Sequence, residues 1–355
     1  MRSAETMAGS PKPLSGIRDR ALFLVWGSQG KGPRSRVFAR ELGVDVWFIE
    51  SSLRRGRLTA PLRYLSEGAR TLLLLSRRRP RIVFVQSPPT PAVMLVAVYC
   101  AFAGARFIVD AHSAAMQAPR WTRPRWLYRV LARRALVTIV TNDHFARTIR
   151  SWGATALVVR DVPTSSPGGE TPFPVDGGFN VMVVNSFAPD EPLAEVMEAA
   201  RRCKDVRFYI TGDPDRPGIR RPSSVPDNVR FTGFLPDGEY HALMRACQAV
   251  ACFTTRDHTM QRGACEALWL GTPIVTSDWP LLRAYFRKGA VHVDGSAEGI
   301  RAGIERVVRD HDRYAREILE LQVDHRADWA EALGELLALI DPVTTERSTR
   351  PRKER

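Results

Sequence analysis

Short, nearly continuous hydrophobic runs alternate along the chain with longer segments whose hydrophobic residues recur every three or four positions. The first pattern predicts buried strands and the second predicts helices. The predicted strands of the first half are residues 21–27, 44–50, 81–88, 106–113, 136–142 and 156–163. Those of the second half are 180–186, 206–214, 228–236, 249–255, 274–278 and 290–294. Buried strands separated by helices are typical of an α/β fold in which helices cover both faces of a parallel sheet.

A segment rich in Ser, Pro and Gly separates the two series of strands, and we interpret it as a linker. The chain has 355 residues, enough for two domains that each bury a core. The predicted divisions are a flexible N-terminus (1–19), an N-terminal domain (20–163), the linker (164–178), a C-terminal domain (179–325), a final helix (326–341) and a basic flexible tail (342–355).

The segment HTMQRGACEALWLGTPIVTSD, residues 258–278, predicts a polar loop, a short helix, a turn and a buried strand. Gly263 lies beside the helix start, where unpaired backbone N–H groups and the helix dipole attract an anion. Glu266 follows about one turn later among small or apolar neighbours, and a carboxylate can accept two hydrogen bonds from a vicinal diol. Phosphate and diol at this spacing indicate a nucleotide. The alternative is an acid stabilised by the helix dipole alone.

The stretch EALWLGTPIVTSD resembles the donor-site signature of family 4-like glycosyltransferases of the two-domain GT-B fold. That signature has two acids separated by seven residues, then Ala, apolar residues, Gly-x-Pro and a hydrophobic strand. By this resemblance Glu266 is the second acid, which holds the ribose hydroxyls of a nucleotide sugar. His258 stands where the first acid belongs, and this departs from the family. ITGD, NVRFTGFLP and DWAEALGELLALI are also similar to family segments, in the same order.

The resemblance implies two Rossmann-like parallel-sheet domains that face a cleft, with the acceptor on the N-terminal side and the nucleotide sugar on the C-terminal side. The helix 326–341 would cross back to the first domain. The family places an Arg and a Lys after the first strand of the second domain, but Ser186 and Glu191 stand there. Arg262 is our preferred substitute for the diphosphate, and a plain solvated loop residue is the alternative. The predicted donor-binding residues are Gly212, Phe234, Leu235, Arg262, Gly263, Ala264 and Glu266.

In the first domain the Gly-rich loop SQGKGPRSR is neither a GxGxxG motif nor a P-loop. By the resemblance it lines the cleft, and its predicted contact residues are Ser28, Gly30, Lys31, Gly32 and Arg34. Arg34, Lys31 and Arg256 are further candidates for the diphosphate.

His112 follows a buried strand and matches a family histidine near the reacting sugar, so we predict His112, Glu266 and His258 as catalytic. The alternative for His112 is a histidine satisfied by local hydrogen bonds, and Asp110 is predicted to orient its loop. No carboxylate pair suited to Mg²⁺ stands out, so no metal and no cofactor beyond the nucleotide sugar is predicted. The resemblance favours retention of the anomeric configuration.

Charged residues are distributed unevenly between the two halves of the chain. Residues 1–167 hold 27 basic and 9 acidic residues, a net charge of +18, whereas the remainder holds 25 and 29, a net charge of −4. Such a division indicates that the first half meets an anionic partner, and Arg beside Trp suits a membrane surface. The alternative is a solvated basic face. The predicted membrane- or acceptor-side residues are Arg54, Arg55, Arg63, Arg120, Trp121 and Trp126.

The five cysteines lack CxxC pairs and no apolar leader precedes the first strand, which favours the cytoplasm. The run 91–105 is short for a membrane span and predicts a buried helix. We therefore expect a cytoplasmic glycosyltransferase, peripheral to the inner face of the membrane, that moves a sugar to a lipid-linked or cell-envelope glycan. The alternatives are a nucleotide-sugar epimerase or hydrolase of the same fold and a catalytically degenerate member. A nucleic-acid-binding protein is disfavoured because no recognition motif is apparent.

Overall fold

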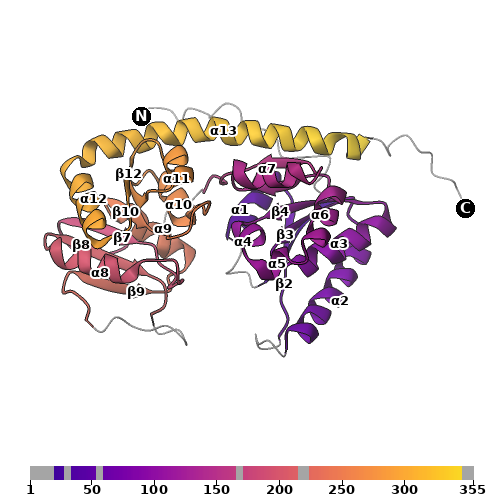
Figure 1. Cartoon of the computed structure of the whole chain (residues 1–355), viewed down its shortest axis with the longest axis horizontal. Coiled ribbons are helices and arrows are strands. Elements are labelled where there is room, and N and C mark those ends of the chain that lie inside the picture. Colours follow the sequence, from indigo (N-terminus) through magenta and orange to yellow (C-terminus); the bar gives the residue numbers. More distant parts are fainter. Residues whose placement is uncertain (1–19, 28–32, 53–58, 165–170, 215–223, 346–355) are drawn as a thin grey trace, which may run out of the picture. The chain divides into compact units, whose positions relative to one another are not determined.

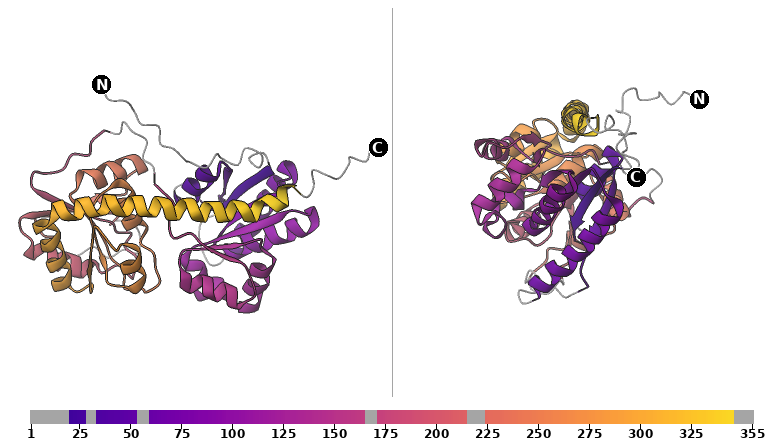
Figure 2. Two further views of the ribbon diagram at one scale, coloured as in Figure 1. Left: turned by 90° about the horizontal axis from the view of Figure 1, so that it is seen from above. Right: turned by 90° about the vertical axis from the view of Figure 1, so that its right-hand side faces the viewer.

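The computed structural model describes residues 20–27, 33–52, 59–164, 171–214 and 224–345. They form two compact units: the described residues up to Val162, together with those from Asp328 onward, make up the first, and those between Pro163 and Ala327 make up the second. The last helix, α13 (His311–Thr345), begins in unit 2 and ends in unit 1, and it is continuous (Figures 1 and 2).

Unit 1 contains a six-stranded, entirely parallel sheet with the strand order β2-β1-β3-β4-β5-β6. The strands are β1 (Ala21–Trp26), β2 (Asp45–Ile49), β3 (Ile82–Ser87), β4 (Arg106–Ala111), β5 (Thr138–Val140) and β6 (Ala156–Val158). The helices are α1 (Pro33–Leu42), α2 (Ala60–Arg78), α3 (Thr90–Ala103), α4 (Ser113–Gln117), α5 (Pro119–Thr122), α6 (Arg125–Arg134) and α7 (Asp143–Ser151).

Both faces of this sheet are buried, because alternate residues of each strand enter different cores. On β1, Leu22 and Leu24 pack in one core with residues of α2, α3, α6 and α7. Phe23 and Val25 pack in the other with α1 and with Leu336 of α13. The strands therefore read as continuous hydrophobic runs in the sequence.

Unit 2 repeats this plan with the strand order β12-β11-β10-β7-β8-β9, again all parallel. Its strands are β7 (Phe179–Val183), β8 (Val206–Thr211), β9 (Val229–Gly233), β10 (Ala249–Cys252), β11 (Ile274–Ser277) and β12 (Ala290–Val293). Its helices before α13 are α8 (Leu193–Arg202), α9 (Asp237–Ala246), α10 (Arg262–Leu270), α11 (Pro280–Tyr285) and α12 (Ala297–Arg309). Helices α8 and α12 cover one face, and α9, α10 and α11 cover the other.

The predicted fold class is confirmed, since each unit is a parallel sheet covered by helices on both faces. The sequence pattern did not predict α4, α5 and α11. These helices have four to six residues, which is too short to show a helical period. Within the segment interpreted as a linker, residues 171–178 form no helix or strand, but Phe173 and Val175 pack against the core of unit 2.

The backbone at Gly289, just before β12, has a φ of +65° and touches α13. A Cβ atom there would lie 2.5 Å from the backbone of Ile318. We expect Gly289→Ala to lower the free energy of unfolding by about 2 kcal/mol or more, because it adds both backbone strain and a clash that neither helix nor turn can relieve. Urea unfolding of the full chain measures this.

Gly334→Ala is the matched control, because Gly334 lies within the same helix α13 with open space around its Cα. Removing a glycine from a helix interior is expected to raise the free energy of unfolding by about 0.5–1 kcal/mol. Equal stability of the two variants would contradict the packing of Gly289 on α13.

Candidate active site

Parallel strands place all their carboxyl ends at one sheet edge, and ligands bind there where the strand order reverses. In unit 2 the reversal lies between β7 and β10, which pair directly. The loops that follow these two strands and the start of α10 therefore build the candidate donor site. In unit 1 the reversal lies between β1 and β3.

Helix α10 begins at Arg262 after Gln261, whose side chain does not cap it. Gly263 and Ala264 are buried in its first turn. A Cβ atom on Gly263 would lie 2.7 Å from the side chain of Val184, the residue that follows β7. Glycine is therefore needed for the loop after β7 to reach the helix start, where backbone N–H groups attract anions.

Glu266 is only 6% exposed, and two side chains hold its carboxylate. Tyr240 of α9 donates its hydroxyl to Oε2 at 3.1 Å, and Arg262 donates Nε to Oε1 at 2.9 Å. The guanidinium also donates to the Thr164 hydroxyl at 3.0 Å. The sequence-predicted ribose acid and the preferred diphosphate cation are thus paired with each other, as residues four apart on a helix readily are.

Burial raises the pKa of Tyr240 well above its usual value, and the nearby Glu266 carboxylate raises it further. The phenol therefore stays protonated and remains a hydrogen-bond donor. A ligand hydroxyl that replaces it at Glu266 would supply the same donor to the same oxygen.

In the loop after β7, a carboxylate of the loop itself binds the backbone N–H groups. Glu191 accepts hydrogen bonds from the backbone N–H groups of Ser186 and Ala188, at 2.8 and 2.9 Å, and from the Ser186 hydroxyl. Beside it, Asp190 accepts from Thr254 and pairs with Arg256. Arg256, a further candidate for the diphosphate, is therefore tied to an acid of this loop.

Gly212 follows β8 with a φ of +91°, and a Cβ atom there would lie 2.4 Å from the Asn185 carbonyl oxygen. Its backbone bridges to Gly233, the residue before Phe234. Phe234 is 74% exposed, whereas Leu235 packs into the core beside Tyr240. The turn with the predicted donor-binding residues Phe234 and Leu235 therefore leads directly into α9, the helix that carries Tyr240.

His258 also has a left-handed backbone, with a φ of +53°. Its imidazole Nε2 lies 3.6 Å from the Asp257 carboxylate, and its side chain is 40% exposed. The residue that replaces the family acid is therefore paired with the preceding aspartate.

In unit 1 the structure brings three predicted residues together. His112 pairs through Nε2 with Asp110 at 3.1 Å, and Asp110 is 1% exposed. Arg34 lies in the first turn of α1, 3.7 Å from Asp110, and donates to the Val159 carbonyl. Arg34 is 8% exposed, so it holds the sheet edge together instead of presenting a cation to solvent.

Burial by itself raises the pKa of Asp110, but the neighbouring His112 and Arg34 outweigh it and hold the pKa below its usual value of 3.8. Asp110 therefore remains a carboxylate that fixes the orientation of His112.

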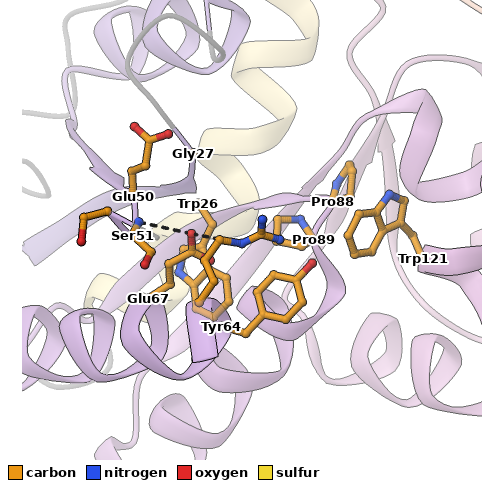
Figure 3. Close-up of a pocket in the computed structure, with 11 residues that line it drawn as sticks. Trp26, Gly27, Glu50, Ser51, Tyr64, Glu67, Pro88, Pro89 and Trp121 are labelled. Carbon is orange, nitrogen blue, oxygen red and sulfur yellow. Dashed lines mark hydrogen bonds and ion pairs between the residues drawn. The ribbon is translucent and has the colours of Figure 1, made fainter. Parts of the chain in front are cut away.

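A pocket of about 470 Å³ lies at the reversal point of unit 1 (Figure 3). Arg63 and Trp121, predicted for the membrane or acceptor side, line it together with Trp26, Tyr64 and Glu67. Arg120 stacks over Trp121 at 5.0 Å outside the pocket lining, and Trp126 lies on α6 with 66% exposure. The predicted residues Ser28, Gly30, Lys31, Gly32, Arg54 and Arg55 lie outside the described residues.

Sequence reasoning missed Tyr240, Trp26, Tyr64 and Glu67. Glu67 carried a usable signal, because it is the single acid of the strongly basic helix α2. Tyr240 and Tyr64 sit in ordinary helical patterns, and nothing in the sequence distinguishes them. Among the described residues no cluster of three or more His, Cys, Asp or Glu could hold a metal ion, and none of the described helices is long and apolar enough to cross a membrane.

Comparison with known proteins agrees with this arrangement. Residues 180–337 match the family model described as glycosyl transferases group 1, and residues 19–164 match the model described as glycosyl transferase 4-like domain. No curated protein sequence matches the chain.

Three solved structures illustrate the shared fold. HepE from Anabaena, with UDP and glucose bound, has a TM-score of 0.62 at 15% identity and covers 90% of this chain and 99% of its own. Sucrose-phosphate synthase from Thermosynechococcus elongatus has a TM-score of 0.65 at 14% identity, with 91% and 99% covered. A candidate UDP-N-acetylglucosamine 2-epimerase from Listeria monocytogenes has a TM-score of 0.56 at 12% identity, with 84% and 91% covered.

The buried Arg34–Asp110 pair predicts a large stability effect. Asp110→Asn leaves Asp161, 3.9 Å away, as the remaining carboxylate beside the Arg34 guanidinium, so we expect the free energy of unfolding to fall by about 2 kcal/mol at neutral pH. Because the folded pKa of Asp110 is lowered, its contribution is present above pH 4 and is lost as the pH falls through the folded value. The difference between wild type and variant, measured by urea unfolding, should therefore shrink below about pH 4.

Asp143→Asn serves as the control, because Asp143 pairs with Arg160 at 2.7 Å on the exposed surface. Its loss is expected to cost less than about 1 kcal/mol. Similar effects for the two substitutions would show that Asp110 is not an energetically important partner of Arg34.

Proposed function

We propose, for a chain that belongs to the group 1, family 4-like glycosyltransferases, that the start of α10 holds the donor and that Glu266 binds its ribose hydroxyls. The observation that carries the proposal is a carboxylate 6% exposed, one turn into a helix that begins at the reversal point of unit 2. Both partners of this carboxylate, Tyr240 and Arg262, are donors that ribose hydroxyls can replace.

Donor binding would then release Arg262 from Glu266. Its guanidinium sits on the first residue of α10, next to the N–H groups of Gly263 and Ala264. The freed cation and the helix start together would stabilise the departing nucleoside diphosphate without a metal ion. This compensates in part for the missing Arg and Lys of the loop after β7, where Glu191 adds a negative charge instead.

In the transfer step, the acceptor hydroxyl oxygen forms a bond to the anomeric carbon on the same face from which the diphosphate oxygen departs as its bond breaks. The bonding electrons leave with the nucleoside diphosphate, and the hydroxyl proton passes to it or to water. His112, oriented by Asp110, lies at the carboxyl edge of unit 1 and is proposed to bind near the reacting sugar. We expect retention of the anomeric configuration, as is typical of this family.

We also propose that unit 1 rests on an anionic membrane surface and that the acceptor is a lipid-linked or cell-envelope glycan. Helix α3 packs against both α2 and α6, and these three helices carry large hydrophobic side chains exposed to solvent. They are Leu62, Leu65, Leu72, Leu73, Met94, Val98, Phe102, Trp126 and Val130. Exposed arginines accompany them, among them Arg77 and Arg78 on α2 and Arg129 on α6. Apolar and basic side chains on one set of helices match the chemistry of an anionic bilayer interface.

The donor site predicts selective stabilisation by one nucleotide. We expect a thermal shift of a few degrees with UDP, GDP, TDP or ADP, or with the corresponding sugar, at about 100 times its Kd. Glu266→Gln keeps the shape but weakens the acceptor of the ribose hydroxyls, so its affinity should fall about tenfold or more. Glu239→Gln, an exposed acid beside Tyr240, is the control and should bind like wild type.

Other results would select another function. If no nucleotide stabilises the chain at millimolar concentration, the site is degenerate and the proposal fails. If a nucleotide sugar is bound and then isomerised or hydrolysed at the same rate with or without any acceptor, the epimerase or hydrolase alternative holds.

The membrane proposal predicts sedimentation with vesicles of phosphatidylglycerol and phosphatidylcholine, weakened by salt. Leu65→Asp and Phe102→Asp place a negative charge on side chains that are 71% and 89% exposed, so binding should fall severalfold without unfolding. Val323→Asp, at 66% exposure on α13 in unit 2, is the control. Equal binding by all variants, or equal binding to neutral vesicles, would refute this docking surface.

A further inference from the structure

The pocket of unit 1 occupies the position at which open parallel sheets bind ligands. Trp26 ends β1 and Gly27 follows it, and Pro88 and Pro89 follow β3, so the pocket spans the point where the strand order reverses. Its volume of about 470 Å³ lies within the range of about 300–1,000 Å³ usual for small-molecule sites. Every lining residue belongs to unit 1.

Three aromatic rings form its walls. Trp26 and Tyr64 stack with ring centroids 6.0 Å apart and an interplanar angle of 26°. The indole N–H of Trp26 donates to the Thr71 hydroxyl at 2.8 Å, which fixes the ring before any ligand enters. Trp121 and the two prolines lie at one end of the pocket and Glu50 at the other (Figure 3). The indole N–H of Trp121 is buried and has no hydrogen-bond partner among the described residues.

Charged groups meet these rings inside the pocket. Glu67 is 5% exposed and lies 3.4 Å from the backbone N–H of Ser51 and 3.9 Å from Nε of Arg63. The Arg63 guanidinium lies over the Tyr64 ring at 4.9 Å. With Glu50, the lining holds two carboxylates and one guanidinium. The pocket is therefore locally acidic in a half of the chain whose net charge is +18.

The combination of aromatic rings and charged groups limits the chemical class of ligand that fits the pocket. A purely apolar molecule would leave Glu67 and Arg63 desolvated without new partners. A phosphate or other anion would face two carboxylates. A sugar ring satisfies both features, because its C–H face packs on an aromatic ring while adjacent hydroxyls donate to a carboxylate and accept from a guanidinium or an indole N–H.

We propose that this pocket is the acceptor site and that it binds a neutral sugar residue. The sugar ring stacks on the Trp121 side chain, and a pair of its hydroxyls donates to Glu67. The proposal rests on the proposed glycosyltransferase function. It narrows the acceptor to a carbohydrate whose bound residue carries no phosphate or carboxylate.

The pocket is also placed to deliver a hydroxyl to the candidate catalytic group. The His112 backbone N–H donates to the Ser87 carbonyl at 2.9 Å, and Ser87 directly precedes Pro88 in the lining. β4, which ends before His112, pairs with β3, which ends at Ser87. A sugar in the pocket therefore lies one strand away from the imidazole.

Saturation-transfer NMR on the full chain, with the stabilising nucleoside diphosphate present, tests the proposal. The probes are methyl glycosides of glucose, galactose, mannose and N-acetylglucosamine, the methyl glycoside of glucuronic acid, and choline. We expect saturable binding of at least one neutral glycoside and weaker binding of glucuronide and choline. Glu67→Gln and, independently, Trp121→Ala should each weaken that binding about tenfold.

Glu41→Gln is the matched control, because Glu41 lies on α1, whose core is on the opposite face of the sheet from that of α2. It should bind sugars like wild type, and all variants should keep the nucleotide-induced thermal shift. If the nucleotide still binds but no neutral glycoside does, or if glucuronide or choline binds more tightly, the acceptor proposal fails while the donor site stands. Unchanged sugar binding in both pocket variants, at wild-type melting temperature, also refutes it.

Discussion

The parallel arrangement of both sheets is the constraint on which the rest of the structure depends. Parallel strands require crossover helices, and those helices bury both faces of the sheet. The catalytic and ligand-binding side chains therefore lie at the edge of the sheet where the strands end. The aromatic pocket, the Asp110–His112 pair and the start of α10 all lie at such an edge, in each unit at or beside the reversal of strand order.

Both candidate sites contain an Arg–Glu ion pair with the same spacing on a helix. In unit 2, Arg262 and Glu266 pair four residues apart on α10, and in unit 1, Arg63 and Glu67 pair four residues apart on α2. In each case the carboxylate is nearly buried and the guanidinium is the more exposed partner. The helix backbone fixes the spacing, so each acid is oriented before a ligand arrives.

The hydrophobic pattern predicted every strand and the longer helices, because burial on both faces leaves a continuous apolar run that is visible without tertiary information. It also identified Glu266, whose apolar neighbours marked it as a buried acid. It missed Tyr240, since an aromatic hydroxyl in an amphipathic helix gives no sign of the carboxylate 26 residues away that it will contact. It gave Arg34 and Arg262 as candidates for the diphosphate without their acidic partners, because the sequence alone does not show which acids fold against them.

The Glu191 carboxylate gives the loop after β7 an unusual property. It is tethered five residues from the N–H group of Ser186, so its effective concentration at that site far exceeds that of any free anion. A phosphate that approaches these N–H groups must therefore compete with the Glu191 carboxylate, which is covalently tethered and cannot diffuse away. The loop therefore discriminates against adventitious anions, and only a ligand anchored elsewhere, at the helix start or at Glu266, would have the additional binding energy to displace the Glu191 carboxylate.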